Sequence, residues 1–391
     1  MLLSLAHLTY HRLVTLLGAA LLLAQLAAAG RVVARFLRRR AARQITPSRA
    51  APNSVTVIVP VLNEEERLEP CLEGLLRQGE EVAEILVVDG GSVDATRALV
   101  EAAAARDGRV RWLDASPVPP SWNGKAWGLE VGRRAARTPW LLCVDADVRP
   151  APALAASLVA FAERERLTLL SAAIEQRLAG WLDALIHPAF LTTLVYRLGP
   201  PGTVARTVDV AQANGQCLLV HWRTLAELGG FHPIRSSRCE DVTLARIFVA
   251  AGERVAMAEA PSLAWVQMYD SAMAIWRNWP RSLPLVDQFG RPLAIRGLIE
   301  ATLIQALPSL LLPFLLRTRS NVGRALAALN FVLLAGRIGV LVGAASAYPS
   351  RPWSYWLSPL ADAPALIAIW VSLFRRRHLW RGRILVEGAP A

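Results

Sequence analysis

Long apolar runs near both ends of the 391-residue chain constrain its fold more than any other feature. Residues 13–30 (LVTLLGAALLLAQLAAAG) are long enough to cross a bilayer as one helix, and further apolar stretches cover 298–316, 325–347 and 357–374. The chain is 54% hydrophobic with a mean hydropathy of +0.34, which is too apolar for an ordinary soluble enzyme. We therefore expect membrane segments on either side of a more polar domain.

The net charge of +12 is concentrated beside these runs. Arginine clusters of this kind mark the cytoplasmic side of a membrane and contact anionic lipids. A cleavable signal peptide at 13–30 is disfavoured, because the cluster that follows would have to be translocated. No nucleic-acid-binding motif accompanies the charge. We expect a multi-pass protein of the bacterial inner membrane whose amino terminus is outside and whose polar domain faces the cytoplasm. The clusters are Arg31, Arg35, Arg38, Arg39, Arg40 and Arg43, and Arg375, Arg376, Arg377, Arg381 and Arg383.

The C-terminal stretches leave the topology open. Three full spans would place the arginine-rich tail outside. The stretch 298–316 contains Glu300, Gln305 and two prolines, which favours a re-entrant or in-plane segment that keeps the tail inside. Arg337 is costly inside a bilayer, so we expect it to have a packed partner or a polar cavity, with snorkelling as the alternative.

Short β-rich runs alternate with helical stretches between residues 54 and 270. This alternation predicts an α/β fold with a mainly parallel sheet covered by helices on both faces, in which ligands bind beyond the carboxyl ends of the strands. Strands are expected at 54–59, 84–88, 109–113, 140–144, 215–220 and 253–257, and helices at 64–78, 93–106, 124–136 and 241–251. The expected organisation is a membrane anchor (1–43), a linker (44–53), a catalytic domain (54–270), an interfacial segment (271–297), membrane segments (298–377) and a tail (378–391).

Acidic motifs follow three of the predicted strands. Asp145 and Asp147 are two residues apart at a strand end, so they can bind one Mg²⁺ or Mn²⁺ that bridges to a diphosphate, although two solvated aspartates in a turn are the alternative. The loops after the first two strands are also polar and acidic. Three such strand ends together favour a nucleotide site more strongly than any one motif does. No G-x-G-x-x-G or P-loop is present, which disfavours a dehydrogenase or P-loop enzyme. The other donor-binding candidates are Pro60, Asn63, Glu64, Asp89, Ser92 and Asp94.

Three further motifs contain candidate site residues. Lys125 lies near a predicted helix amino terminus, where phosphate binds well, and Trp122 offers a flat face for a sugar or base. Asp241, preceded by Glu240, is a candidate general base that takes the proton of an acceptor hydroxyl, or else an acid that stabilises a helix dipole. Asn214, Gly215 and Gln216 form a polar turn suited to the acceptor or the donor sugar.

Taken together, these motifs resemble glycosyltransferase family 2, which has the GT-A fold, over residues 54–285. The resemblance implies that Glu64 and Asp89 contact the nucleobase side, that Asp145 and Asp147 contact the ribose and the metal-bound diphosphate, and that Asp241 is the base for inverting transfer. The segment at 119–125, with Met268-Tyr269 and Trp279-Pro280-Arg281, is similar to membrane glycosyltransferases of carotenoid (myxol 2′-O-type) and hopanoid pathways, which implies a lipophilic acceptor. In this interpretation Arg277, Trp279 and Arg281 are leaving-group or acceptor contacts, although the arginines could equally bind lipid headgroups.

The chain departs from processive polysaccharide synthases, which have Gln-x-x-Arg-Trp, because Gln288-Phe289-Gly290-Arg291 is followed by Pro292. This favours transfer of a single sugar, by a hexosyltransferase, to a membrane lipid acceptor such as a carotenoid-type hydroxyl. The alternatives are a polyprenyl-phosphate sugar transferase and a non-catalytic membrane scaffold with a transferase-like domain.

Overall fold

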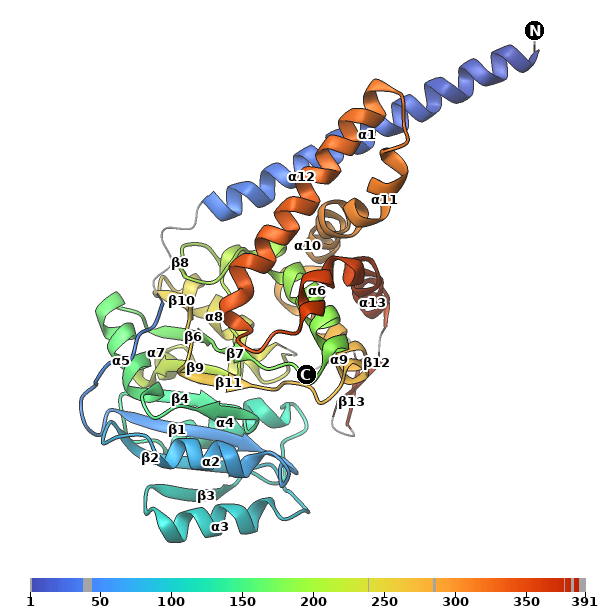
Figure 1. Cartoon of the computed structure of the whole chain (residues 1–391). Coiled ribbons are helices and arrows are strands. Elements are labelled where there is room, and N and C mark those ends of the chain that lie inside the picture. The colour runs from blue at the N-terminus through green and yellow to red at the C-terminus, as the bar shows by residue number, and fades with distance from the viewer. Residues whose placement is uncertain are drawn as a thin grey trace.

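An eight-stranded sheet forms the centre of one half of the molecule (Figure 1), in the order β3-β2-β1-β4-β9-β6-β10-β8. The computed structural model describes residues 2–37, 44–237, 239–283, 286–375, 377–380 and 383–386. Strands β3, β2, β1, β4, β6 and β10 share one direction, because β9 is antiparallel to both β4 and β6, while β8 is antiparallel to β10. The predicted α/β fold with a mainly parallel sheet is confirmed. The strands are β1 Val55–Val61, β2 Val82–Asp89, β3 Val110–Asp114, β4 Trp140–Val144, β6 Leu169–Ala173, β8 Thr203–Ala205, β9 Cys217–His221 and β10 Val255–Glu259.

Helices cover both faces of this sheet because side chains alternate along its buried strands. In β1, Val55, Val57 and Val59 pack under one helical layer, whereas Ile58 packs under the other. A small second sheet combines β5 (Val148–Pro150), β11 (Ala264–Val266) and β7 (Glu175–Gln176). The first helical layer contains α2 Leu68–Leu76, α3 Thr96–Arg106 and α5 Leu154–Glu165; the second contains α4 Gly124–Ala135, α7 Trp222–Glu227 and α8 Glu240–Ala250. Residues 44–180 and 200–270 are called the sheet domain below.

Helix α4 packs closely on β1 through glycine. A Cβ added to Gly132 would lie 2.5 Å from Ile58 Cγ2, and one added to Gly128 would lie 3.2 Å from Pro60 Cβ. These glycines let the helix approach the strand that leads to Pro60, and so position the amino terminus of α4 at the end of the sheet where the loops gather.

We expect Gly132→Ala to lower the free energy of unfolding by about 1–3 kcal/mol, the usual effect of overpacking a core. In an unobstructed helix the same change would stabilise by about 0.5–1 kcal/mol. Thermal unfolding of the detergent-solubilised chain measures the difference. Gly108→Ala is the control, because a Cβ at Gly108 meets no atom within 4 Å; equal melting temperatures for the two variants would contradict the packing argument.

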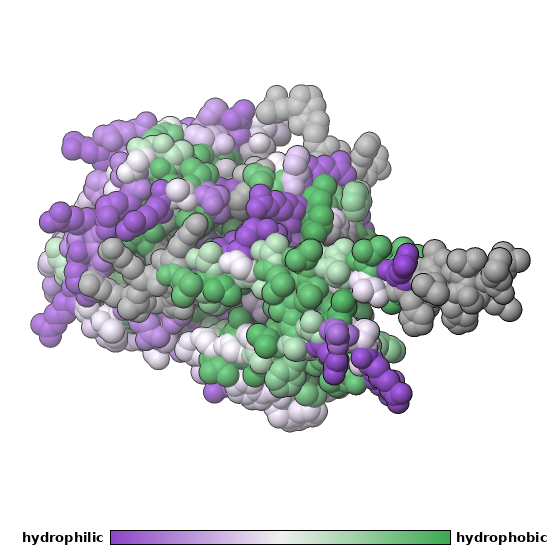
Figure 2. All heavy atoms as spheres, turned by 90° about the horizontal axis from the view of Figure 1, so that it is seen from above, coloured by the Kyte–Doolittle hydropathy of each residue, from purple (hydrophilic) through white to green (hydrophobic). Residues whose placement is uncertain are grey.

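Apolar helices form the second half of the molecule, called the helical bundle below. Four helical stretches in the described residues are long and apolar enough to cross a membrane: Arg12–Leu37, Gly290–Leu315, Asn321–Ala347 and Trp353–Phe374. Apolar side chains gather over this part in Figure 2, whereas polar ones cover the sheet domain. The bundle contains α1 Leu2–Leu37, α6 Trp181–Leu198, α9 Ala272–Asn278, α10 Val286–Ala301, a π-helical turn Thr302–Ala306, α11 Leu307–Leu315, α12 Asn321–Ala344, a 3₁₀ segment Trp353–Ala361 and α13 Asp362–Phe374.

Helices α1 and α12 run side by side in the same direction, toward the sheet domain (Figure 1). The side chains of Gln25 and Asn330 exchange two hydrogen bonds of 3.0 Å, and Phe36 and Val340 belong to one apolar cluster nearer the sheet domain. The stretch 298–316 therefore leads away from the sheet domain as a helix, and the turn after α11 lies at the far end. This differs from the expectation of a re-entrant segment at 298–316, because the polar residues there are buried against other helices: Gln305 donates to Ala189 O and Glu300 pairs with arginines of α1.

The last stretch, 353–374, turns back instead. It begins near the sheet domain, where Tyr355 donates to Leu341 O near the end of α12. Its deepest point in the bundle is Asp362, which lies beside Gln305. From there α13 runs along α10 back toward the sheet domain, and the Phe374 ring lies 5.5 Å from the Arg291 guanidinium. The chain therefore leaves α13 on the same side from which it entered, and 56% of this stretch is buried inside the protein.

The expected partner of Arg337 is present. Its guanidinium bonds Asp362 at 2.8 and 3.0 Å and Ser358 Oγ at 2.9 Å, and both charged side chains are fully buried. The prediction of a packed partner is confirmed, and this ion pair joins α12 to the turning segment.

Candidate active site

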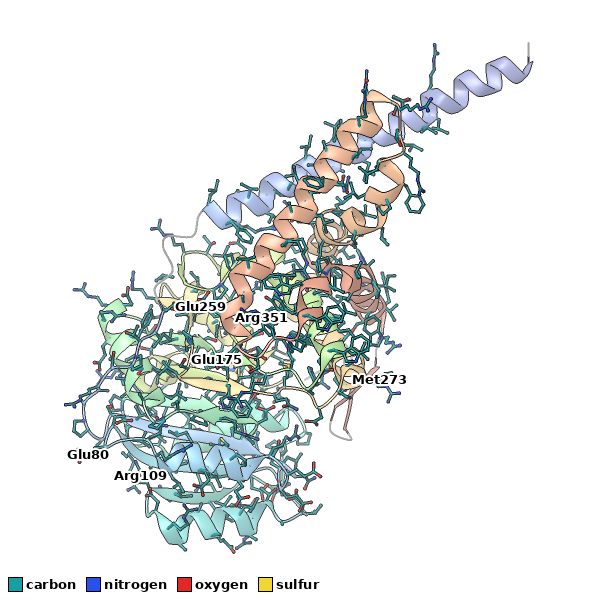
Figure 3. The ribbon with its side chains drawn as sticks, viewed as in Figure 1. Glu80, Arg109, Glu175, Glu259, Met273 and Arg351 are labelled. Carbon is teal, nitrogen blue, oxygen red and sulfur yellow. The ribbon has the colours of Figure 1, made fainter. Side chains whose placement is uncertain are left out.

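One cavity of about 1050 Å³ lies beyond the carboxyl ends of β1 and β4 and continues into the helical bundle. The strand order reverses between β1 and β4, which is where ligands bind in open α/β sheets. Figure 3 labels Glu175 and Glu259, two lining residues, at the boundary of sheet domain and bundle, whereas Glu80 lies at the opposite edge of the sheet. The predicted site residues that line the cavity are Pro60, Glu64, Lys125, Asp145, Asp147, Asn214, Gly215, Gln216, Glu240, Asp241, Trp279 and Arg281.

Lys125 lies at the centre of the polar end. Its Nζ is 2.7 Å from Asp145 Oδ1 and 3.0 Å from Glu240 Oε1, so it joins the loop after β4 to the start of α8. Burial opposes the charged form of this lysine, but Asp145 and Glu240 outweigh burial and hold its pKa well above the ordinary value. A Cβ at Gly215 would lie 2.9 Å from the same Nζ, so the ammonium group lies directly against the Gly215 backbone.

Asp241 is placed by the first turn of α8. Its Oδ2 accepts a hydrogen bond from Gly215 N at 2.6 Å, and its Oδ1 accepts one from Val242 N at 2.8 Å. Burial and the neighbouring Glu240 raise the pKa of Asp241 to about 7, while Lys125 opposes the rise. A carboxylate with a pKa near neutrality is suited to accept a proton from a substrate hydroxyl.

Asp147 is the best-placed metal ligand. Its Oδ1 is buried and has no hydrogen-bond partner among the described residues, and burial together with Asp145 raises its pKa to about 6. A buried carboxylate oxygen beside a second carboxylate suits a divalent cation, which would satisfy both. Among the described residues no group of three His, Cys, Asp or Glu side chains is arranged to hold a metal. Mg²⁺ is commonly held in proteins by one or two carboxylates together with substrate phosphates.

The loops after β1 and β2 are tied to each other, and most of their polar groups lie outside the cavity. Asp89 Oδ1 accepts hydrogen bonds from Gly91 N, Ser92 N and Ser92 Oγ, so this carboxylate shapes its own loop. Asn63 Oδ1 accepts from Val93 N, and Asp94 accepts from Glu65 N. In the structure Asn63, Asp89, Ser92 and Asp94 form hydrogen bonds within and between these loops, whereas Glu64 lines the cavity. Donor binding by these four residues stays a prediction.

Trp122 and Arg277, two further candidate site residues, also lie outside the cavity. Trp122 packs edge-on against Trp127 and His232, with ring centroids 5.1 and 5.8 Å apart, and does not line the cavity. Arg277 is exposed on α9 and lies outside the cavity as well. Trp279, two residues further along the chain, lines the cavity instead. The Trp279 ring lies 4.3 Å from the ring of His187, at the border of the polar and apolar ends.

The cavity wall next to the bundle contains residues that the sequence analysis did not identify. Gln176 of β7 donates to Gln216 Oε1, which also accepts from Asn214 Nδ2. His187 of α6 shares a 2.8 Å hydrogen bond with Tyr348 Oη. Beyond them the wall is apolar and is formed by α6 and α12. No motif marks the residues of this apolar wall, because they are ordinary apolar and glycine residues of two helices that the fold brings together.

Comparison with known proteins is consistent with this geometry. Residues 56–209 match the model of glycosyl transferase family 2. The chain is 31% identical over 116 residues to an uncharacterized glycosyltransferase, EpsJ of Bacillus subtilis (30% of this chain, 32% of that protein). It is 32% identical over 127 residues to the lipopolysaccharide core biosynthesis glycosyltransferase LpsC of Rhizobium meliloti (32% of this chain, 40% of that protein). The chain thus spans about a third of the length of these curated relatives.

A solved structure is similar over nearly the whole chain. A mannosyltransferase from Pyrobaculum calidifontis, in complex with GDP-Man and Mn²⁺, superposes with a TM-score of 0.54 and 20% identity, covering 91% of this chain and 96% of that one. At this identity the likeness shows a shared fold. The family match is confined to residues 56–209, and the fold of the chain is the GT-A fold.

Proposed function

We propose that this chain transfers one hexose from a nucleotide-sugar donor to the hydroxyl of a membrane-dissolved lipid, with inversion at the sugar carbon. The observation that carries the proposal is that Asp241 and the pair Asp145 and Asp147 line one cavity, whose other end lies between apolar helices. A polar donor and an apolar acceptor can both reach such a site. A carotenoid-type alcohol is our specific candidate for the acceptor.

In the proposed reaction the bond from the acceptor oxygen to the sugar carbon forms as the bond from that carbon to the diphosphate breaks. Asp241 takes the proton of the acceptor hydroxyl, and the Gly215 and Val242 N–H groups hold its carboxylate in place. A divalent metal held by Asp145 and Asp147 would supply positive charge to the leaving diphosphate. Lys125, between Asp145 and Glu240, adds a second cation to the same end of the cavity.

A transfer assay tests this proposal. The purified chain is incubated with Mn²⁺, radiolabelled UDP- and GDP-hexoses, and vesicles that contain either a dihydroxy-carotenoid or a polyprenyl phosphate. We expect label in the carotenoid fraction. Label only in the polyprenyl phosphate would favour that second acceptor class, and no label in any lipid would contradict the proposal, as a non-catalytic scaffold requires.

Metal removal should weaken donor binding. We expect EDTA to lower donor affinity at least tenfold in the unmodified chain, because the diphosphate loses its bridging cation, and to have little effect in Asp147→Asn. Isothermal titration with the nucleotide diphosphate measures both. Glu80→Gln is the control, since Glu80 is exposed at the opposite edge of the sheet (Figure 3). Equal EDTA sensitivity of Asp147→Asn and the unmodified chain would remove Asp147 from the metal site.

We also propose that α1, α10–α11 and α12 cross the membrane and that 353–374 re-enters from the cytoplasmic side. This topology places Arg31, Arg35 and Arg375 on the side of the sheet domain, as the positive-inside rule expects, and Arg317, Arg319 and Arg324 on the opposite side. Residues 38–43, 376, 381–382 and 387–391 lie outside the described part of the chain.

The topology predicts opposite locations for two reporters. A fusion at residue 320 should report the periplasm, and a fusion after residue 391 should report the cytoplasm, in paired alkaline phosphatase and fluorescent-protein assays. A periplasmic carboxyl terminus would show instead that 353–374 is a full span.

A further inference from the structure

The cavity has an apolar end that continues beyond the acidic residues into the helical bundle. Pockets for a single ligand hold roughly 300–1,000 Å³, and this cavity of about 1050 Å³ extends past Trp279 and His187 into the bundle. Its wall there is formed by Leu191, Leu194 and Val195 of α6 and by one face of α12. Figure 1 shows the end of α12 beside the sheet domain, so this part of the cavity lies where the bundle meets the catalytic loops.

Three glycines, together with Val340 and Ala344, form the face of α12 that lines the cavity. Gly336, Gly339 and Gly343 are three and four residues apart, so they lie on one side of the helix and extend along it for about 10 Å. A Cβ added to any of them would meet no heavy atom within 4 Å. This face, Gly336–Gly339–Gly343, is called the glycine face below.

Close helix packing does not explain the glycine face. Small residues in membrane helices usually let a neighbouring helix approach, as at Gly18 of α1, where a Cβ would lie 3.0 Å from Val322 Cγ1. At the glycine face there is open space instead. Each glycine destabilises a helix interior by about 0.5–1 kcal/mol relative to alanine. The three residues therefore weaken α12, and they are exposed on the open side of the cavity, where a Cβ would contact none of the described residues. What they provide is width in the cavity.

We propose that the apolar body of the acceptor lies on the glycine face, between α6 and α12, with its hydroxyl directed at Asp241. The glycine face then selects acceptors by width: a rigid, methyl-branched body fits against bare helix backbone, where larger side chains would exclude it. This inference rests on the proposed function, because it names the part of the site that holds the acceptor. The carboxylates and the glycine face line the same cavity. The hydroxyl and the apolar body of one acceptor can therefore bind in it together.

Filling the glycine face tests the inference. Gly339→Leu places a side chain in open space and should fold normally. We expect it to lower transfer to a dihydroxy-carotenoid in phosphatidylcholine vesicles at least tenfold through a raised acceptor KM, with donor affinity unchanged within twofold. Gly339→Ala should have an intermediate effect. The matched control is Gly30→Leu in α1, where a Cβ also meets nothing within 4 Å and which does not line the cavity.

A binding measurement complements the transfer assay. Gly339→Cys should react with a membrane-permeable maleimide, and the dihydroxy-carotenoid should slow this modification at least threefold, whereas Gly30→Cys should be unprotected; mass spectrometry identifies the labelled residue. Transfer by Gly339→Leu equal to that by Gly30→Leu, or no protection of Gly339→Cys, would overturn the inference while leaving the proposed function intact. Absence of transfer by the unmodified chain would instead contradict the proposed function.

Discussion

Replacing Asp241 with asparagine should lower the rate of sugar transfer by about two to four orders of magnitude, the usual contribution of a general base. The amide cannot accept the acceptor proton, yet it keeps the size and position of the carboxylate in the first turn of α8. Donor affinity should stay within about threefold, because the proposed donor contacts lie on other loops. Steady-state transfer and nucleotide titration separate the two effects. An asparagine variant that retained a third of the activity would exclude Asp241 as the base.

The pH profile gives an independent measurement of the same residue. Only the ionised carboxylate can accept a proton, and burial together with Glu240 raises the pKa of Asp241 to about 7. Activity should therefore rise with pH through about 7 and fall roughly tenfold per pH unit well below it. Glu240→Gln removes the neighbouring negative charge and should move the rising limb to lower pH. A profile that is flat between pH 5 and 8 would contradict this assignment.

Arg337→Met should lower the free energy of unfolding by about 3–5 kcal/mol, because it leaves the fully buried Asp362 without its partner. Within the described part of the chain, Asp362 would retain only the 2.8 Å hydrogen bond from Gln305 Nε2. The double variant Arg337→Met/Asp362→Leu removes both charges and should recover most of the loss, since buried ion pairs can be replaced by apolar pairs at little cost.

Denaturant titration in detergent micelles measures these differences. Arg324→Met is the matched control, because Arg324 is exposed on the same helix, and its effect should be within about 0.5 kcal/mol. A double variant as unstable as Arg337→Met would show that the pair is needed for more than charge neutralisation, and the ion-pair argument would fail.

Sequence patterns predicted elements correctly where a hydrophobic pattern and a local motif occur together. The run 140–144 predicted β4 because five apolar residues in succession suit a strand buried on both faces, and Asp145 and Asp147 follow at its end. The span of α4 was predicted within one residue, since Asn123 caps its amino terminus by accepting from Ala126 N. Strand β6 and helix α6 were not predicted, because their small and apolar residues have no distinct period or cap.

Several predictions about site residues depended on the direction in which a side chain points, which no sequence pattern contains. Asp89 follows a buried strand as Asp145 does, yet its carboxylate turns back onto the N–H groups of its own loop, while Asp145 meets Lys125. Trp122 packs against Trp127 instead of facing a ligand. In each case the sequence placed the residue at the correct edge of the sheet, and competition among nearby hydrogen-bond and packing partners decided where the side chain points.

The sequence by itself determined the α/β alternation, the apolar helices and the acidic residues at the strand ends, because each follows from neighbours within a few positions along the chain. The tertiary structure alone decided which of those acids share a cavity, which apolar stretch turns back, and that three glycines of α12 line the same cavity. These outcomes depend on contacts between segments as distant as residues 145, 241 and 339. Such contacts form only when buried surface and paired charge across the whole fold outweigh the alternatives available to each segment.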